Sequence, residues 1–151
     1  MVDAKDGRAG LVKVLFRLER DLSGWPPLNI EGLWAKEINE SEYMLCNVPF
    51  YVRGIANGDV VSVVEERGER FFENVVREGG HGTIRVLLKR TEQLDDVLEK
   101  LEGFRCGIEV AEPRLLAIDV QVETSLAALL EFLDAEEAAA RLGYEVGCKS
   151  W

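Results

Sequence analysis

The hydrophobic pattern of the chain changes at Thr83, and this change constrains the fold more than any other feature. After it, a segment that alternates like a strand precedes two stretches with apolar residues at helical spacing. Two more strand-like segments separate these stretches and a last one follows them, while Gly103 and Gly143 end the two helices. We expect Thr91 to cap the first helix and Thr124 or Ser125 to cap the second. The order β-α-β-β-α-β predicts a ferredoxin-like sandwich, in which two helices cover one face of an antiparallel sheet.

Before Thr83 the chain shows short strand-like segments, glycine turns and no long helical pattern. We expect strands at residues 11–19, 31–38, 42–46, 60–66 and 70–76. Strands of this length predict a small antiparallel β-barrel of the SH3 or OB type, which closes to limit its exposed edges. The expected fold class is therefore α+β, with a barrel at residues 1–82 and a ferredoxin-like domain at residues 83–151. The connection between them is too short to hold them apart, so we expect one compact unit.

The charge balance argues against several classes of partner. The chain has 18 Lys and Arg against 28 Asp and Glu, a formal net charge of −10. Nucleic-acid binding needs a basic face that displaces counterions, so we expect no nucleic-acid partner. Apolar runs fall short of the roughly 20 residues of a membrane span, and the first residues lack the apolar block of a signal peptide. We expect a cytoplasmic protein without membrane contact.

The cysteines predict neither disulfides nor a metal site. Cys46, Cys106 and Cys148 are odd in number and form no CxxC pair, which is typical of free thiols in a reducing compartment. Together with His81 they are enough in number for a tetrahedral zinc site. Such sites usually have two ligands close together in the sequence, and this chain has no such pair. We expect neither a metal nor another cofactor.

The first candidate site is the segment 79–86, which contains the only histidine. Strand alternation places His81, Thr83 and Arg85 on one face, opposite the apolar residues between them. Functionally, the glycine amides and Arg85 would bind a carboxylate or phosphate, with His81 as an acid or base. Structurally, the same segment would be a tight joint between domains, with Arg85 paired to a carboxylate. The joint is the interpretation that we favour.

Two further candidates lie in loops of the first half. One is an apolar pocket with a polar rim, lined by Phe50, Tyr51 and Trp34 with Asn47, Arg53 and Asp59. The alternative is that these aromatic side chains simply fill the mouth of the barrel. The other candidate is Trp25, which precedes two prolines and is either an interaction site or an anchor for its loop.

Four segments resemble a bacterial family known as domain-of-unknown-function family 4265. They are residues 31–35 (EGLWA), 47–51 (NVPFY), 54–61 (GIANGDVV) and 80–85 (GHGTIR). Gly82 stands where the family pattern as we know it favours serine. The resemblance implies no activity, because none is assigned to the family.

We expect a non-enzymatic binding protein of unknown ligand, with its best candidate site at the domain junction. Motifs of the common catalytic and nucleotide-binding sites are absent from the sequence, so no catalytic residue is predicted. An immunity-protein-like role is one form that such binding would take. The alternatives are an enzyme that acts on a small anionic substrate through His81 and Arg85, and a ligand-sensing regulatory module. Oligomeric state and the identity of the partner, protein or small molecule, stay open.

Overall fold

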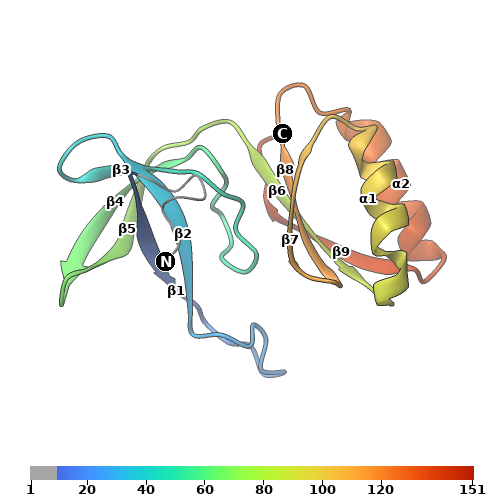
Figure 1. Ribbon diagram of the computed structural model, residues 1–151, viewed down its shortest axis with the longest axis horizontal. Coiled ribbons are helices and arrows are strands. Elements are labelled where there is room, and N and C mark those ends of the chain that lie inside the picture. Colours follow the sequence, from blue (N-terminus) through green and yellow to red (C-terminus); the bar gives the residue numbers. More distant parts are fainter. Residues whose placement is uncertain (1–9) are drawn as a thin grey trace.

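Two β-sheets lie side by side in the computed structural model, which describes residues 10–151, and both helices pack on the outer face of the second sheet (Figure 1). The first sheet lies within residues 11–77 and the second within residues 82–148. This matches the change of pattern at Thr83, while the exact domain boundary stays a prediction. Neither helix in the described part of the chain is long and apolar enough to cross a membrane.

The first sheet is a closed barrel of five strands. They are β1 (Leu11–Arg17), β2 (Ile30–Glu37), β3 (Glu42–Leu45), β4 (Val60–Glu66) and β5 (Glu69–Arg77). Consecutive strands pair antiparallel, but β1 and β5 pair parallel, through Val14 with Arg70 and Leu15 with Phe71. The barrel is therefore antiparallel as predicted except at its closing pair. Because the strand direction reverses from each strand to the next, the first and the fifth strand run in the same direction where they meet.

The barrel core follows the alternation of its strands. Val14 and Phe16 point inward from β1, and Leu33 and Ala35 point inward from β2, each with at most 1% of its surface exposed. Glu31 is in phase with Leu33 and Ala35 and is buried as well. An acidic side chain on the inner face of a strand needs hydrogen-bond donors there.

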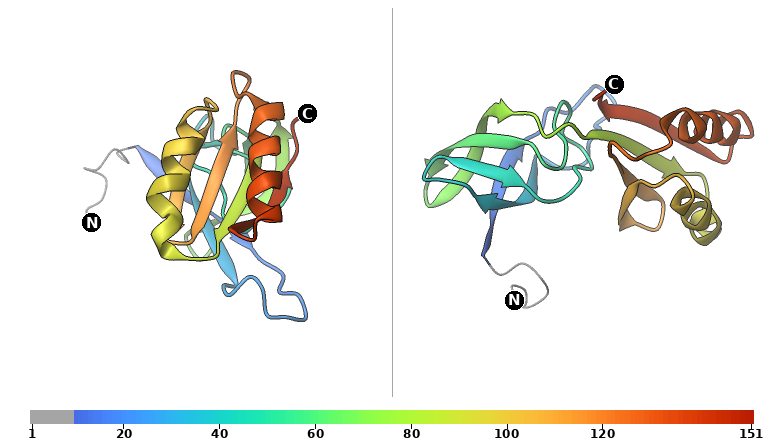
Figure 2. Two further views of the ribbon diagram at one scale, coloured as in Figure 1. Left: turned by 90° about the vertical axis from the view of Figure 1, so that its right-hand side faces the viewer. Right: turned by 90° about the horizontal axis from the view of Figure 1, so that it is seen from above.

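The second half has the predicted element order, and its two helices cover one face of a four-stranded sheet (Figure 2). A 3-10 turn at Thr91–Gln93 precedes α1, and the elements are β6 (Gly82–Leu88), α1 (Leu94–Glu102), β7 (Gly107–Glu112), β8 (Leu115–Val120), α2 (Leu126–Ala138) and β9 (Leu142–Cys148). The strand order is β7-β8-β6-β9, with antiparallel neighbours throughout. Ile84, Val86 and Leu88 of β6 join the core under the helices.

The N-cap of the first helix differs from the prediction, whereas that of the second lies at a predicted position. Thr91 begins the 3-10 turn, and Gln93 occupies the N-cap position of α1. Ser125 occupies the N-cap position of α2, but its side chain makes no capping hydrogen bond. Packing therefore stabilises these helices more than capping does, mainly through the fully buried Leu101 of α1 and Leu129 of α2.

The opposite face of the second sheet is covered by residues 46–59, which connect β3 to β4 and which we call the junction loop. Figure 1 shows this segment between the barrel and the second sheet. Its backbone bonds directly to the second half, where Gly54 N donates to Gly147 O at 2.9 Å. A Cβ on Gly79 would collide with the Gly58 carbonyl oxygen, so the chain between the sheets passes this close to the junction loop only with glycine at position 79.

We expect the two halves to unfold in one cooperative transition, because the junction loop contributes to both. Both helices lie in the second half, whereas two of the three tryptophans, Trp25 and Trp34, lie in the first. A Trp151→Phe background removes the third, so that the fluorescence reports on the first half alone. Far-UV circular dichroism at 222 nm and tryptophan fluorescence should therefore give coincident denaturation curves. Two separated transitions would mean that the junction contacts add little to stability.

Candidate functional site

His81, Thr83 and Arg85 all face the junction loop, but they do not share one opening. Thr83 is fully buried between the other two, and its hydroxyl donates to the Ile55 carbonyl at 3.3 Å. The junction loop thus covers the middle of the predicted row. His81 and Arg85 have to be considered separately.

The His81 imidazole is held by a carboxylate that the sequence analysis missed. Its Nδ1 lies 2.7 Å from Oδ1 of Asp119, whose other oxygen accepts from Asn57 Nδ2 and Gln121 Nε2, each at 3.1 Å. Asp119 is buried, while the His81 side chain keeps 30% of its surface exposed. Asn57 comes from the junction loop, so this network joins the two halves. A lone Asp in the apolar run of β8 is the sequence signal for it.

Arg85 is buried and bonded to the backbone of the junction loop. Its Nη1 donates to the carbonyl of Val52 at 2.9 Å and to that of Pro49 at 3.4 Å. A Cβ on Gly147 would lie 2.6 Å from Arg85 Nη2, so the guanidinium packs directly on the backbone of β9. Burial lowers the pKa of Arg85 from its usual value, because the charged guanidinium has lost hydrating water.

Arg85 also lines a cavity of about 790 Å³, which we call the junction cavity. Its walls come from the loop between β1 and β2, from the junction loop and from β6, β8 and β9. The lining residues that matter below are Trp25, Phe50, Tyr51, Arg53, Arg85 and Glu145. The indole of Trp25 packs edge-on against the Tyr51 ring, with centroids 5.6 Å apart. The junction cavity therefore brings together residues from all three sequence-predicted candidates.

The second predicted group is divided between two cavities. Trp34 and Asn47 line another cavity of about 640 Å³, on which Phe50 and Tyr51 also border. Asn47 is engaged there, since its Oδ1 accepts from the Trp34 amide at 2.8 Å. Arg53 belongs to the junction cavity instead.

Asp59 lines neither of these two cavities. Its buried carboxylate accepts from the amides of Ala56 at 3.0 Å and Gly79 at 2.9 Å. It fixes the end of the junction loop to the chain that leads into β6. Within residues 10–151, the turn at the end of the junction loop leaves the Ala56 amide without a backbone partner, and the Asp59 carboxylate supplies the acceptor.

Glu31 is a second buried carboxylate that the sequence analysis missed. It accepts from the backbone amides of Phe50 at 2.6 Å, Tyr51 at 3.0 Å and Val52 at 2.9 Å. These residues form the wall between the two cavities. Glu31 therefore holds the aromatic side chains in place without lining the junction cavity.

Glu109 of β7 contacts the junction loop from the other side, and its pKa has a consequence for stability. Its Oε2 accepts from the Val48 amide at 3.0 Å, and burial raises the pKa of the carboxyl above its usual value. Because the pKa is higher in the folded protein, the neutral carboxyl of Glu109 is favoured there over the charged one. The stability that comes from the neutral form is fully present below the ordinary pKa, and it is lost as pH rises through the raised pKa.

We therefore expect Glu109→Gln to become more stable relative to the wild type as pH rises. The amide keeps an acceptor for Val48 but carries no charge to desolvate. Denaturant unfolding of both proteins at pH 4 and pH 7 measures the effect. An advantage of the variant that shrinks toward pH 7 would contradict the assignment.

The described residues contain no cluster of three or more His, Cys, Asp or Glu side chains placed to hold a metal ion. Cys46, Cys106 and Cys148 are free thiols. Burial raises the pKa of Cys106 to about 11, so this thiol stays protonated at neutral pH.

Comparison with known proteins identifies relatives in sequence and in fold. A family model described as "Domain of unknown function (DUF4265)" matches residues 31–144. No curated protein matches the chain. A crystal structure of a hypothetical protein from Neisseria gonorrhoeae has a TM-score of 0.75 at 21% identity, over 91% of this chain and 94% of that one. At this identity the likeness shows the fold alone.

Proposed function

The chain belongs to the DUF4265 family, and we propose from the geometry of its junction that it is a non-enzymatic binding protein for a small molecule. The ligand occupies the junction cavity. The single observation that supports this most is a cavity of about 790 Å³ walled by both halves of the chain. Ligand cavities are typically about 300–1,000 Å³, lie between domains and combine an apolar lining with a few polar groups.

Polar and apolar side chains share the lining of the cavity, and contacts within the protein hold the buried Arg85 in place. Arg85 is bonded to two loop carbonyls, and Arg53 lies 2.8 Å from Glu145. The aromatic wall is fixed by Glu31, which binds the amides of the residues that carry it. Because Arg85 and the aromatic wall are already ordered, less conformational entropy is lost when a ligand binds.

The geometry supports binding over catalysis by the predicted pair. His81 and Arg85 are four residues apart, roughly 13 Å along an extended chain. Only Arg85 lines the junction cavity, and the fully buried Thr83 lies between them. A single small substrate in this cavity would contact Arg85 but not the imidazole.

We also propose the finer fold assignment and the location. The strand order β7-β8-β6-β9 with two helices on one face supports a ferredoxin-like sandwich. Five short strands closed into a barrel support an SH3-like or OB-like unit. The free cysteines support a cytoplasmic location, and the net charge of −10 supports partners other than nucleic acid.

Thermal unfolding against a panel of small metabolites tests the proposed function. A ligand at 100 times its Kd should stabilise the wild type by about 2.7 kcal/mol and raise Tm by roughly 5–10 °C. Leu87→Trp should remove that shift, because Leu87 lines the cavity and a larger side chain occupies it.

Val64→Trp is the matched control, because Val64 is 43% exposed like Leu87 but lies on the barrel away from the cavity. It should keep the shift. A ligand whose effect survives Leu87→Trp binds elsewhere, and that result would contradict the proposal.

A further inference from the structure

Two guanidinium groups and one carboxylate meet at the wall of the junction cavity. Arg53 Nη2 lies 2.8 Å from Glu145 Oε2, and Arg85 Nη2 lies 4.0 Å from the same oxygen. Oε2 is buried and has no aligned hydrogen-bond donor among residues 10–151, so its contact with Arg53 is an ion pair only. The cluster therefore carries one more positive than negative charge.

The positive charge of Arg85 is only partly offset by the carboxylates that act on it, Glu145 and the buried Glu31. The Arg85 side chain is only 6% exposed, so water screens its charge little. The carbonyls of Pro49 and Val52 satisfy its Nη1 but bring no negative charge. The Arg53 side chain is 69% exposed and is able to turn toward a ligand. An anionic group beside these side chains would gain charge-assisted hydrogen bonds.

The rest of the cavity limits that anion to a single charge. Glu19 and Asp21 also line it, whereas Arg17, the third guanidinium of the lining, is paired with Glu66 at 2.8 Å. The whole chain carries a net charge of −10. Asp21 is held in its loop, where Oδ1 accepts from the amides of Ser23 at 2.8 Å and Trp25 at 3.1 Å. A phosphate dianion would meet stronger repulsion from these carboxylates than a carboxylate would.

The remaining lining suits an apolar body. Trp25, Phe50 and Tyr51 form an aromatic wall, and Leu87 and Leu115 come from the second sheet. The volume of about 790 Å³ is far larger than a carboxylate head group needs. Most of a bound molecule would therefore lie against apolar side chains.

We propose that the ligand is a monocarboxylate with an aromatic or branched aliphatic body. Its carboxylate pairs with Arg53 and Arg85, and its body packs against Trp25 and Tyr51. This inference rests on the proposed function, and it adds the chemical class of the ligand.

Calorimetric titration with three probes that share one body tests the head group. They are 3-phenylpropionate, 3-phenylpropan-1-ol and 3-phenylpropylamine. We expect the carboxylate to bind at least about 10-fold more tightly than the alcohol, equivalent to about 1.4 kcal/mol, and the amine to bind most weakly. Arg53→Gln should lower the ratio of carboxylate to alcohol affinity without abolishing it, because Arg85 still pairs with the carboxylate.

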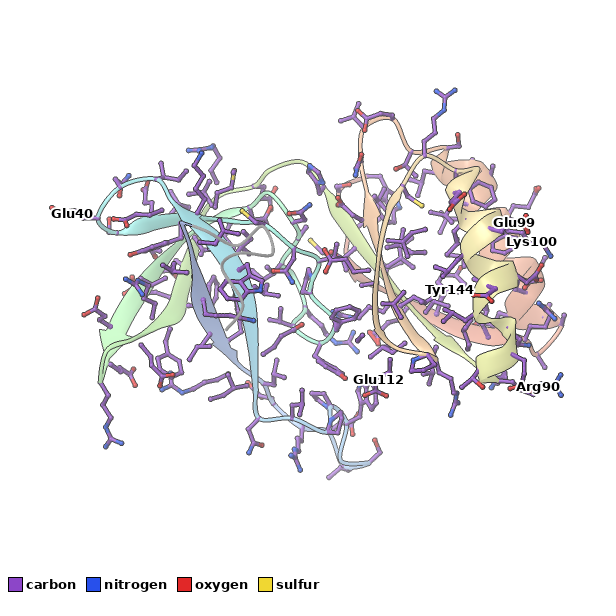
Figure 3. All side chains as sticks on the ribbon, viewed as in Figure 1. Glu40, Arg90, Glu99, Lys100, Glu112 and Tyr144 are labelled. Carbon is purple, nitrogen blue, oxygen red and sulfur yellow. The ribbon has the colours of Figure 1, made fainter. Side chains whose placement is uncertain are left out.

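Arg90→Gln is the control, because the Arg90 side chain is 72% exposed and also ion-paired, but lies outside the cavity. Figure 3 shows Arg90 at the end of the second half that is far from the barrel. The variant should leave the ratio unchanged. Equal binding of the three probes, tightest binding of the amine, or binding of none would overturn the carboxylate proposal. The proposed function fails separately, if no member of the metabolite panel gives a Tm shift that Leu87→Trp removes.

Discussion

Replacing Glu31 by Ala is expected to lower the free energy of unfolding by about 3–5 kcal/mol. The buried carboxylate accepts three backbone amides from residues 50–52, and Ala leaves all three without this acceptor. Hydrogen bonds to a charged group contribute about 1.5–3 kcal/mol each, and neighbouring ones do not add fully. Urea denaturation of the two proteins measures the loss.

Two companion variants separate the acceptor role from other effects. Glu31→Gln keeps one acceptor oxygen and should lose an intermediate amount. Glu37→Ala, on the exposed end of the same strand, should change stability by less than about 0.5 kcal/mol. A loss below 1 kcal/mol for Glu31→Ala would mean that the segment 50–52 is held by packing alone.

The segments that carry the family resemblance are those that build the junction. Glu31 binds residues 50–52, and Asn47 accepts from the Trp34 amide, so the first two segments bond to each other. The third segment bonds to the chain around the fourth, since Thr83 donates to Ile55 and Gly79 to Asp59. A family pattern of this kind reflects the construction of a joint as directly as it would a ligand site.

The regular elements were predictable because alternation and helical spacing are local properties of the sequence. The change at Thr83, the two helices and the strands appear close to their expected positions. The course of the junction loop was not predictable. Pro49 marks a break in pairing, but nothing in the sequence says that the loop crosses to the second sheet. Its contacts run through backbone amides and carbonyls, which every residue carries.

For the candidate site, the direction in which side chains point was predictable, whereas their backbone partners were not. Alternation with Ile84 and Val86 correctly directs Arg85 away from the helices, but its partners are loop carbonyls without a sequence signal. Two signals were present and missed. Glu31 is in phase with inward apolar residues of β2, and Asp119 lies within the apolar run of β8. A lone carboxylate at a buried strand position indicates amides or an imidazole opposite it.

Replacing Arg85 by Ala is expected to cost about 3–5 kcal/mol of stability as well, in the absence of any ligand. The guanidinium is buried and bonds to two carbonyls of the junction loop, so its removal leaves both acceptors without their donor and empties a packed position against β9. Arg53→Ala removes the exposed partner of the same carboxylate and should cost only about 0–1 kcal/mol. Urea denaturation compares the two variants.

Joint and ligand site are therefore not exclusive roles for Arg85. The bonds to the junction loop hold the Arg85 guanidinium at the wall of the junction cavity, where it would pair with a carboxylate ligand. The contribution of Arg85 to stability is measured without ligand. Loss of ligand affinity in Arg85→Ala alone would not distinguish the roles, because that variant also loosens the loop. Arg53→Ala provides the separation, since it should lose affinity for 3-phenylpropionate while keeping its stability. If Arg85→Ala were as stable as Arg53→Ala, the guanidinium would not hold the halves together.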